Sequence, residues 1–376
     1  MKHAILAFLL FFFAACLVQA QIVVPASTFP VPGDTLFTQR DNMPGNLDLG
    51  SPGGPQQWDF SDLQAPFTRQ TVIQEPGEGQ ADAEFPQATY MADITELGGE
   101  TYFQNTDTEM RLLGVFGEDP VGFGLQVLLK YTPPAIEKRA DLTYPASNSH
   151  SFDFSLPAAF EDLPDFVQDT IPISVDSVRL RFSIERTDEV DAWGRMTIPV
   201  GTFDVIREKR IIIRNIRFDA KLLPDAPWLD LTDMAGDIVP PPDTLTSYVF
   251  HSNVAKEPIA VVNVDDLGEL LSVEYKANDM VLRVKDSRNI EAGVYGYPNP
   301  AVNYMRFDFF GLQRGTYTLR ILNVLGQELW RNTYFLSGDI TERVDLSSFR
   351  KGTYLYSLQD ARGKTLLTRR FIILRP

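Results

Sequence analysis

The clearest structural signal in the chain is the stretch VRLRFSIE at residues 178–185. Its even-numbered positions are apolar, and its odd-numbered positions are charged or polar. Successive side chains of a strand point to opposite faces, so this alternation predicts a strand with one face on a core and the other in water. That pattern is typical of an antiparallel sheet with one solvated face.

Further strand patterns run through residues 21–285, which we call the passenger. Helical periodicity is scarce in this range, and the prolines at 133–134 and 240–242 indicate loops or sheet edges because proline cannot donate a ladder hydrogen bond. We expect an all-β passenger of one or two sandwich-like units, and a subdomain break near 132–150 stays open. The remaining strand candidates are 193–199, 203–218, 248–252, 258–264 and 270–275.

The last part of the chain also consists of short alternating segments. Residues 305–309 and 317–321 alternate between apolar and polar side chains, and LNVLGQ at 322–327 and DARG at 360–363 have the composition of turns. About six short strands in residues 297–376 predict a small C-terminal immunoglobulin-like antiparallel β-sandwich.

Charge divides the chain unevenly and limits its partners. The net charge is -16, and binding to nucleic acid needs a basic surface that neutralises phosphates, so we expect no nucleic-acid partner. Residues 291–376 hold 12 Lys/Arg and 7 Asp/Glu, whereas residues 21–290 hold 21 and 43. This change of sign indicates a boundary between two separate units.

The first twenty residues have the composition of a secretory signal peptide. Lys2 precedes an unbroken apolar run over residues 4–18, and no acidic residue accompanies it. The run is shorter than the ~20 apolar residues that span a bilayer, and the small residues that end the segment are typical of a signal peptidase site. We predict cleavage between Ala20 and Gln21. Lipoprotein processing at Cys16 stays open as the alternative.

Motifs in residues 291–376 resemble the type A C-terminal sorting domain of the type IX secretion system. They are YPNP at 297–300, LNVLGQ at 322–327, DLSSF at 345–349, GTY at 352–354 and RRFII at 369–373. Each motif is short, but their order at the end of a chain with a signal peptide is specific. By this resemblance the sorting-signal residues are Tyr297, Pro298, Asn299, Pro300, Gly326, Gly352, Tyr354, Arg369 and Arg370.

The resemblance implies a route and a set of partners. The signal peptide directs such a chain across the inner membrane, and the type IX machinery recognises the sorting domain and exports the protein across the outer membrane. A surface sortase then removes the domain, and the passenger is released or attached to surface lipopolysaccharide. We therefore expect a protein that is secreted or lies on the outer face of the outer membrane. Surface lipopolysaccharide or an extracellular glycan is a further expected partner.

These observations predict four segments: a signal peptide at 1–20, the passenger at 21–285, a linker at 286–296 and the sorting domain at 297–376. Two prolines at 298 and 300 fix φ and interrupt regular structure near the boundary. A sortase must reach exposed backbone between the two units, so we expect the passenger to fold without the sorting domain.

Two passenger motifs are similar to a recurrent arrangement in secreted proteins that carry this sorting domain. One combines LDLG at 47–50, GGP at 53–55 and WDFS at 58–61, and the other is GRMTIPVGTFDV at 194–205. No activity accompanies these motifs, so the resemblance implies no catalytic residue.

The sequence offers no recognisable motif for catalysis, a metal or a cofactor. It contains no Gly-x-Ser-x-Gly elbow, no His-x-x-x-His pair and no Gly-x-Gly-x-x-Gly loop, and its single cysteine excludes a disulfide framework. We expect His150 and His251 to be strand residues. Trp58, Trp193 and Trp228 are expected in the core, with stacking on sugars as the alternative. We therefore predict no catalytic, metal-binding or cofactor-binding residue and no cofactor.

Two functions remain open for the passenger. The absence of catalytic motifs favours a non-enzymatic binding or adhesion domain. The alternative is a secreted carbohydrate-active hydrolase with a carboxylate pair. Acidic clusters such as Glu161-Asp162 do not single out a pair, so a cleft with two facing carboxylates and aromatic walls is the feature that would favour the enzyme.

Overall fold

The computed structural model describes residues 21–374 with several gaps. The predicted signal peptide, the 286–292 part of the predicted linker, Pro298 and Pro300 lie outside the described residues. The gaps are 42–43, 46, 66–67, 95–96, 120–124, 164–167, 169–170, 172, 235–238, 240–241, 266, 279–292, 298, 300, 302–303, 311 and 337–339.

Strands dominate the described part of the passenger, and they join into one 14-stranded sheet. Short 3-10 turns, η1 (Ala26–Thr28), η2 (Pro76–Glu78), η3 (Asp82–Glu84), η5 (Phe160–Asp162) and η6 (Thr232–Met234), lie between them. The strands are β1 (Thr35–Asp41), β2 (Gly53–Asp59), β3 (Thr68–Val72), β4 (Tyr90–Ile94), β5 (Gly99–Asn105), β6 (Glu109–Glu118), β7 (Gln126–Arg139), β8 (Ala146–Ala159), β9 (Ser177–Ile198), β10 (Gly201–Lys221), β11 (Leu229–Asp230), β12 (Asp243–His251), β13 (Ala260–Val264) and β14 (Leu270–Lys276).

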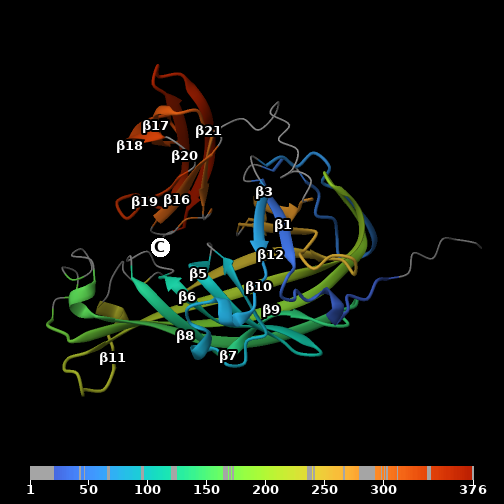
Figure 1. Cartoon of the computed structure of the whole chain (residues 1–376), viewed down its shortest axis with the longest axis horizontal. Coiled ribbons are helices and arrows are strands. Elements are labelled where there is room, and N and C mark those ends of the chain that lie inside the picture. Colours follow the sequence, from blue (N-terminus) through green and yellow to red (C-terminus); the bar gives the residue numbers. More distant parts are fainter. Residues whose placement is uncertain are drawn as a thin grey trace, which may run out of the picture.

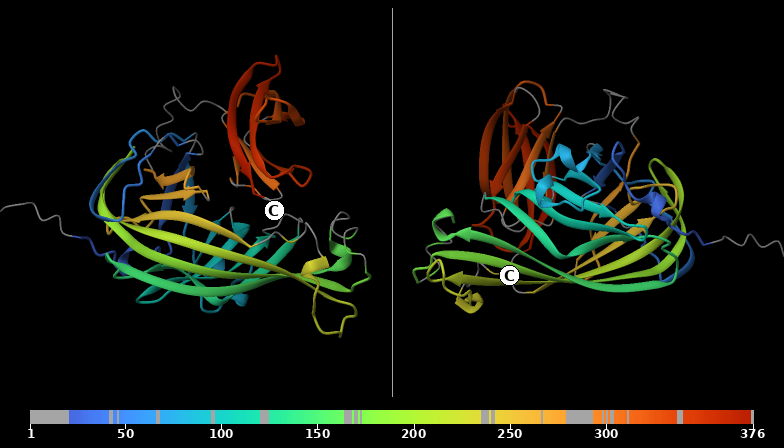
Figure 2. Two further views of the ribbon diagram at one scale, coloured as in Figure 1. Left: turned by 180° about the vertical axis from the view of Figure 1, so that it is seen from behind. Right: turned by 60° about the horizontal axis from the view of Figure 1, so that its bottom comes forward.

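The passenger sheet is strongly curved (Figure 1; Figure 2). Its order is β3-β1-β14-β13-β12-β10-β9-β8-β7-β6-β5-β4, with β2 beside β9 and β11 beside β10. The curvature brings the two edges together: Gln74, just after β3, exchanges backbone hydrogen bonds of 2.9 and 3.0 Å with Met91 of β4. The predicted all-β class is confirmed.

The stretch at 178–185 begins the long β9–β10 hairpin, and its even-numbered residues are buried or nearly so. Farther along, Arg207 pairs with Ala192 whereas Glu208 pairs with Val190, so Asp191 is an extra residue in β9. Such a bulge re-aims the side chains that follow it. Arg207 and Glu208, which point to opposite faces, are both buried, so the sheet is covered on both sides at this point.

The two faces carry different cores. Leu180, Phe182 and Phe218 belong to an apolar cluster on one face near the start of β9. Beyond the bulge, a second cluster forms on the opposite face, where Trp58 and Phe250 lie with their rings 5.0 Å apart, edge to face. The segment around β2 therefore covers the hairpin end of the sheet.

One sequence expectation about prolines is wrong. Pro133 and Pro134 lie inside β7 and not in a loop. The ladder to β6 is interrupted there, because Lys130 pairs with Gly114 and Ala135 pairs with Leu112, so the prolines need no ladder hydrogen bond. On the other side of β7, Thr132 and Asp153 are the pair that joins this strand to β8 in the described residues.

The C-terminal unit is a small sandwich of two antiparallel sheets, as the sequence predicted. A three-stranded sheet has the order β15-β16-β19, and a four-stranded sheet has the order β18-β17-β20-β21. Their shared core contains Phe307, Tyr356 and Phe371, and every described residue in it belongs to the C-terminal unit. The first strand starts at Gly293, so residues 293–296 of the expected linker lie in the sandwich. The strands are β15 (Gly293–Tyr297), β16 (Tyr304–Phe310), β17 (Gly315–Asn323), β18 (Glu328–Leu336), β19 (Ile340–Asp345), β20 (Gly352–Asp360) and β21 (Thr365–Ile373).

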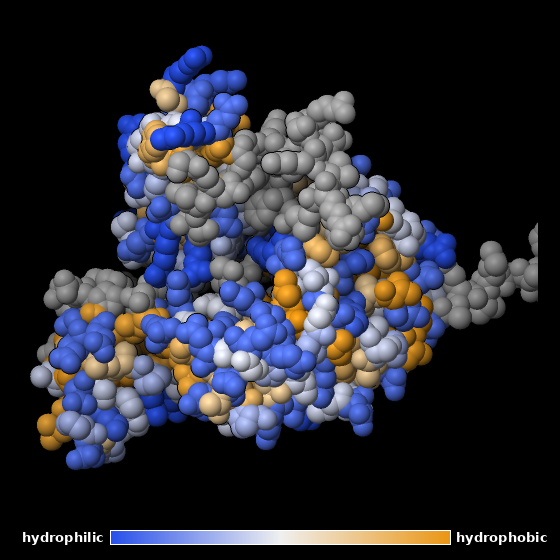
Figure 3. All heavy atoms as spheres, in the orientation of Figure 1, coloured by the Kyte–Doolittle hydropathy of each residue, from blue (hydrophilic) through white to orange (hydrophobic). Residues whose placement is uncertain are grey.

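Apolar and hydrophilic side chains are mixed over the face of the molecule seen in Figure 3. Within the part of the chain that the structure describes, no helix has the length and apolar character needed to cross a membrane.

Candidate functional site

The sorting motifs gather at one end of the C-terminal sandwich. In its four-stranded sheet, Asn323 pairs with Tyr354, and Tyr354 pairs with Phe371. The turn that follows Asn323, the start of β20 at Gly352 and the end of β21 therefore lie side by side. Motifs that are far apart in the sequence thus share one edge of the domain, close to the end of the described chain.

The asparagine of the YPNP motif holds the last strand in place. Asn299 is buried, and its Oδ1 accepts a 2.9 Å hydrogen bond from the backbone N–H of Ile372. Ala301 extends this clamp, because its N–H donates to the Ile372 carbonyl and its carbonyl accepts from Leu374, both at 2.8 Å. Tyr297 lies in β15, and its hydroxyl donates to Asp308 Oδ1 at 3.1 Å.

Tyr354 and the motif glycines shape the same end. The Tyr354 hydroxyl donates to the Arg350 carbonyl at 2.6 Å, and its ring packs 5.6 Å from that of Phe371. Gly326 has a φ of +81°, which side chains rarely tolerate, in a turn where Asn323 Oδ1 accepts hydrogen bonds from two backbone N–H groups. Leu325 at the tip of this turn is 89% exposed.

The two arginines of the last motif differ in exposure. Arg370 is exposed, whereas Arg369 is half-buried and pairs with Tyr356 across the ladder. Gln21 is the first described residue and is exposed. Ala20, Pro298 and Pro300 lie outside the described residues.

The two motifs of the passenger also come together. Strand β2, which carries GGP and the start of WDFS, runs parallel to the part of β9 that carries GRMT. A side chain at Gly194 would collide with the backbone of Gln56, so this crossing requires glycine. Arg207 lies beneath it and is 1% exposed; its Nε and one terminal nitrogen each donate to Asp191 at 2.8 Å, and its other terminal nitrogen donates to the Leu49 carbonyl. The two motifs therefore enclose the buried Asp191–Arg207 ion pair, and we call this arrangement of β2, β9 and the ion pair the clasp. Asp191 belongs to an acidic cluster in the sequence, but no sequence signal indicated Arg207 as its partner.

His150 and His251 both lie on strands, as predicted, but both are surrounded by buried charge. Burial lowers the pKa of His251, whose Nε2 lies 3.9 Å from Oε1 of Glu208, and burial likewise lowers the pKa of His150. Burial alone would raise the pKa of Glu208, but its interactions with His251 and Arg210 lower that pKa far below its usual range.

The charged side chains around these histidines form ion pairs with one another. Arg210 donates to Glu208 at 2.9 Å and to Asp188 at 3.2 Å, and Arg186 donates to Asp188 at 2.8 Å. Among the described residues, no group of three or more His, Cys, Asp or Glu side chains could hold a metal ion. These ion pairs link β9 to β10 inside the passenger.

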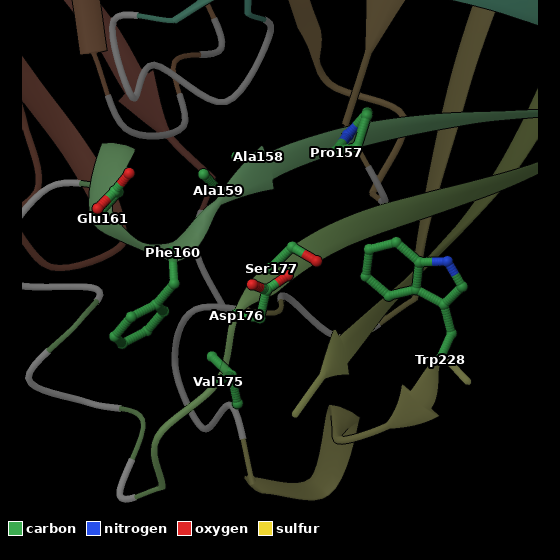
Figure 4. A pocket seen from close by; sticks show the side chains of 9 residues that line it. All are labelled: Pro157, Ala158, Ala159, Phe160, Glu161, Val175, Asp176, Ser177 and Trp228. Carbon is green, nitrogen blue, oxygen red and sulfur yellow. The ribbon is translucent and has the colours of Figure 1, made fainter. Parts of the chain in front are cut away.

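A cleft of about 660 Å³ opens elsewhere, at the ends of β8 and β9. Figure 4 shows Trp228 on one side of Asp176 and Ser177, with Phe160 on the other side. The Arg179 guanidinium lies 4.4 Å from the centre of the Trp228 ring, and cation–π contact at this distance holds the indole in place. The cleft is lined by Pro157, Ala158, Ala159, Phe160, Glu161, Val175, Asp176, Ser177 and Trp228.

The acidic groups of the cleft are open to solvent. Asp176 and Glu161 are exposed, and neither carboxylate forms an ion pair with a described residue. Sequence analysis had named Trp228 and Glu161, but nothing in the sequence pattern indicated that Phe160 and Asp176 lie beside them.

Comparison with protein families identifies the C-terminal unit. Residues 296–374 match the model described as the secretion system C-terminal sorting domain. This match confirms the sequence resemblance and implies interaction with the type IX secretion machinery and export to the medium or the cell surface. The match begins at residue 296 and includes no residue of the passenger.

Comparisons of the whole chain add little. A search of curated proteins finds no match. One solved structure with similarity is that of PorZ, described as an essential bacterial surface component of the type-IX secretion system of human oral-microbiomic Porphyromonas gingivalis. It is 10% identical over 77% of this chain and 50% of the PorZ chain, with a TM-score of 0.18. This chain thus spans half the length of PorZ, and a TM-score this low carries no argument.

Proposed function

We propose that the passenger is a non-enzymatic glycan-binding domain that the type IX system delivers to the cell surface or the medium. The observation that carries this proposal is the cleft beside Trp228. It combines an indole ring that is fixed in place with carboxylates that form no ion pair with any residue the structure describes. Carboxylate oxygens accept hydrogen bonds from sugar hydroxyls, and an aromatic face packs on the C–H face of a sugar ring.

The position of the carboxylates supports binding over hydrolysis. A glycosidase needs a carboxyl group that keeps its proton at neutral pH, and burial against an apolar wall provides this property. Asp176 and Glu161 are instead exposed. In Figure 4 only Asp176 lies beside Trp228, whereas Glu161 stands beyond Phe160. Of the two carboxylates that line the cleft, one lies nearer to the indole ring than the other, and this separation supports binding over hydrolysis.

Export and processing complete the proposed function. The signal peptide at 1–20 is removed after Ala20, and the machinery contacts the end of the sandwich where the sorting motifs gather. Val324 and Leu325 supply exposed apolar side chains at that end, being 63% and 89% exposed. A surface sortase then cuts before the sandwich, and the passenger is released or attached to surface lipopolysaccharide.

Affinity electrophoresis tests glycan binding. The full chain from Gln21 is run through gels that contain soluble polysaccharides or lipopolysaccharide, and retardation by at least one of them is expected. Trp228→Ala and Asp176→Asn should each abolish the retardation. Phe335→Ala removes an aromatic ring that is 65% exposed in the C-terminal sandwich and should leave binding unchanged.

Two results would contradict this proposal. One is retardation that survives Trp228→Ala in every gel. The other is release of reducing sugar from a polysaccharide that disappears in Asp176→Asn or Glu161→Gln, which would identify the passenger as the carbohydrate-active hydrolase.

A further inference from the structure

The three-stranded sheet of the C-terminal sandwich has an outer face that is buried. Along β15 and β16, Val294 and Phe307 point into the core of the sandwich. Their neighbours Tyr295, Tyr297 and Arg306 point the opposite way, because successive side chains of a strand alternate between faces. In an isolated sandwich this outer face would be open to water. Instead, Tyr295 is 1% exposed, Tyr297 4% and Arg306 9%.

Passenger side chains cover this face. The Arg69 guanidinium lies 5.8 Å from the centre of the Tyr297 ring, within the range of a cation–π contact. Arg40 lies close enough to Tyr295 to interact with its hydroxyl. Arg306 forms an ion pair with Glu118 at the end of β6.

The passenger holds these groups in fixed positions. Arg40 of β1 donates to Glu274 of β14 at 2.6 Å, and Arg69 of β3 lies 3.9 Å from the same carboxylate. Three neighbouring strands thus present two guanidinium groups around one carboxylate. Hydrophilic side chains are seen near the junction of the sandwich and the passenger in Figure 3, and in Figure 1 the C-terminal sandwich stands beside β1 and β3 and above β5 and β6.

We infer that Arg40, Arg69 and Glu118 form a docking surface on the passenger for the outer face of its own sorting domain. Among the described residues the two units share no apolar cluster, and the contacts that join them are arginine–tyrosine packing and the Arg306–Glu118 ion pair. Such an interface resembles a transient protein–protein contact more than a domain core. Cutting the connecting chain therefore does not by itself release the sorting domain. The domain stays bound through this surface until it dissociates, and its departure exposes the surface on the passenger.

Cutting the folded full-length protein tests this inference. A recognition site for a specific protease is inserted between β14 and β15, the purified protein is cut, and the products pass through a size-exclusion column in 50 mM salt. The two fragments should elute together. In 0.5 M salt they should separate, because Glu118 is partly exposed and salt screens its ion pair with Arg306.

Charge reversal identifies the surface. Arg306→Glu should weaken the association about tenfold by placing two like charges together, and adding Glu118→Arg should restore it. Lys351→Glu reverses an exposed charge elsewhere in the sandwich and should have no effect. Arg69→Ala lies in the passenger, so it tests the same surface without changing the fold of the sorting domain, and it should also promote separation.

Three outcomes would overturn the inference. The wild-type fragments would elute apart in 50 mM salt, the double charge reversal would fail to restore an association that the single reversal had weakened, or Arg69→Ala would leave the fragments associated as in wild type.

Discussion

In the C-terminal sandwich, most of the sorting motifs that stand out in the sequence come together around the end of β21, where Leu325 and Arg370 are exposed and Asn299 and Tyr354 are buried. In the passenger, the two conspicuous motifs enclose the buried Asp191–Arg207 ion pair, and the cleft beside Trp228 and Glu161 is lined otherwise by residues that belong to no motif. The sequence motifs of the first unit thus include exposed residues of a domain that matches the sorting-domain family, whereas those of the second lie where they hold the fold together. If this difference holds, changes to the sorting motifs should affect export, and changes to the passenger motifs should affect stability.

Removing the recognition end should have the largest effect. A chain that stops after residue 290 lacks every sorting motif, so we expect it to accumulate in the periplasm while the full-length chain reaches the surface or the medium. Immunoblots of periplasm, outer membrane and medium from cells that express each form measure this difference. Normal secretion of the truncated chain would show that the C-terminal sandwich is not the export signal.

Breaking the clasp in the passenger should affect stability strongly. Arg207→Ala leaves the buried Asp191 carboxylate without its partner, which typically costs about 3–5 kcal/mol of unfolding free energy. Urea denaturation of the full chain measures the loss. Arg195→Ala removes the exposed ion pair with Asp204 and should cost no more than about 1 kcal/mol. Equal effects of the two substitutions would contradict a structural role for the clasp.

Loosening the clamp on the last strand should have a smaller effect that is confined to the sandwich. Asn299→Ala leaves the buried N–H of Ile372 without its acceptor, at a typical cost of about 1–3 kcal/mol. Hydrogen exchange should then speed up in β21 and not in β9. Asn332→Ala, at an exposed position of the same sandwich, serves as the control. Faster exchange in β9 would mean that the two units unfold together.

Acidification should weaken the passenger gradually. Burial lowers the pKa of His251, so the unfolded chain takes up a proton at a higher pH than the folded chain does. The unfolding free energy should therefore fall as the pH drops through about 6.5, the ordinary histidine value. The lowered pKa of Glu208 also makes the unfolding free energy fall with pH, but at lower pH. Below about 4.5, the ordinary glutamate value, the unfolded chain takes up a proton that the folded chain does not.

Substituting each histidine in turn shows how much each contributes to the pH dependence of the unfolding free energy. Denaturation curves between pH 7.5 and 5.5 should show a smaller pH dependence in His251→Asn than in wild type. His150→Asn should remove less of it, because His150 is only half-buried. A slope that neither substitution changes would place the sensitive group elsewhere.

The sequence by itself determined the strand content, the sign change in charge and the identity of the sorting domain. Alternation at 178–185 depends only on the two-residue period of a strand, and the sorting motifs need local geometry such as the positive φ of Gly326. Both signals depend only on residues that are close together in the sequence, so they can be recognised without knowing the fold.

Only the tertiary structure decided which distant residues meet. The bulge at Asp191 shifts the register of β9 against β10 between Arg207 and Glu208, and the curvature of the sheet joins β3 to β4. Asp176 and Trp228 meet at the cleft although some fifty residues separate them in the sequence, and Arg69 meets Tyr297 across the two units. Such contacts depend on the register and curvature of the sheet, which arise from the packing of the whole chain. The residues that make these contacts show no periodic pattern in the sequence, so the contacts cannot be predicted from it.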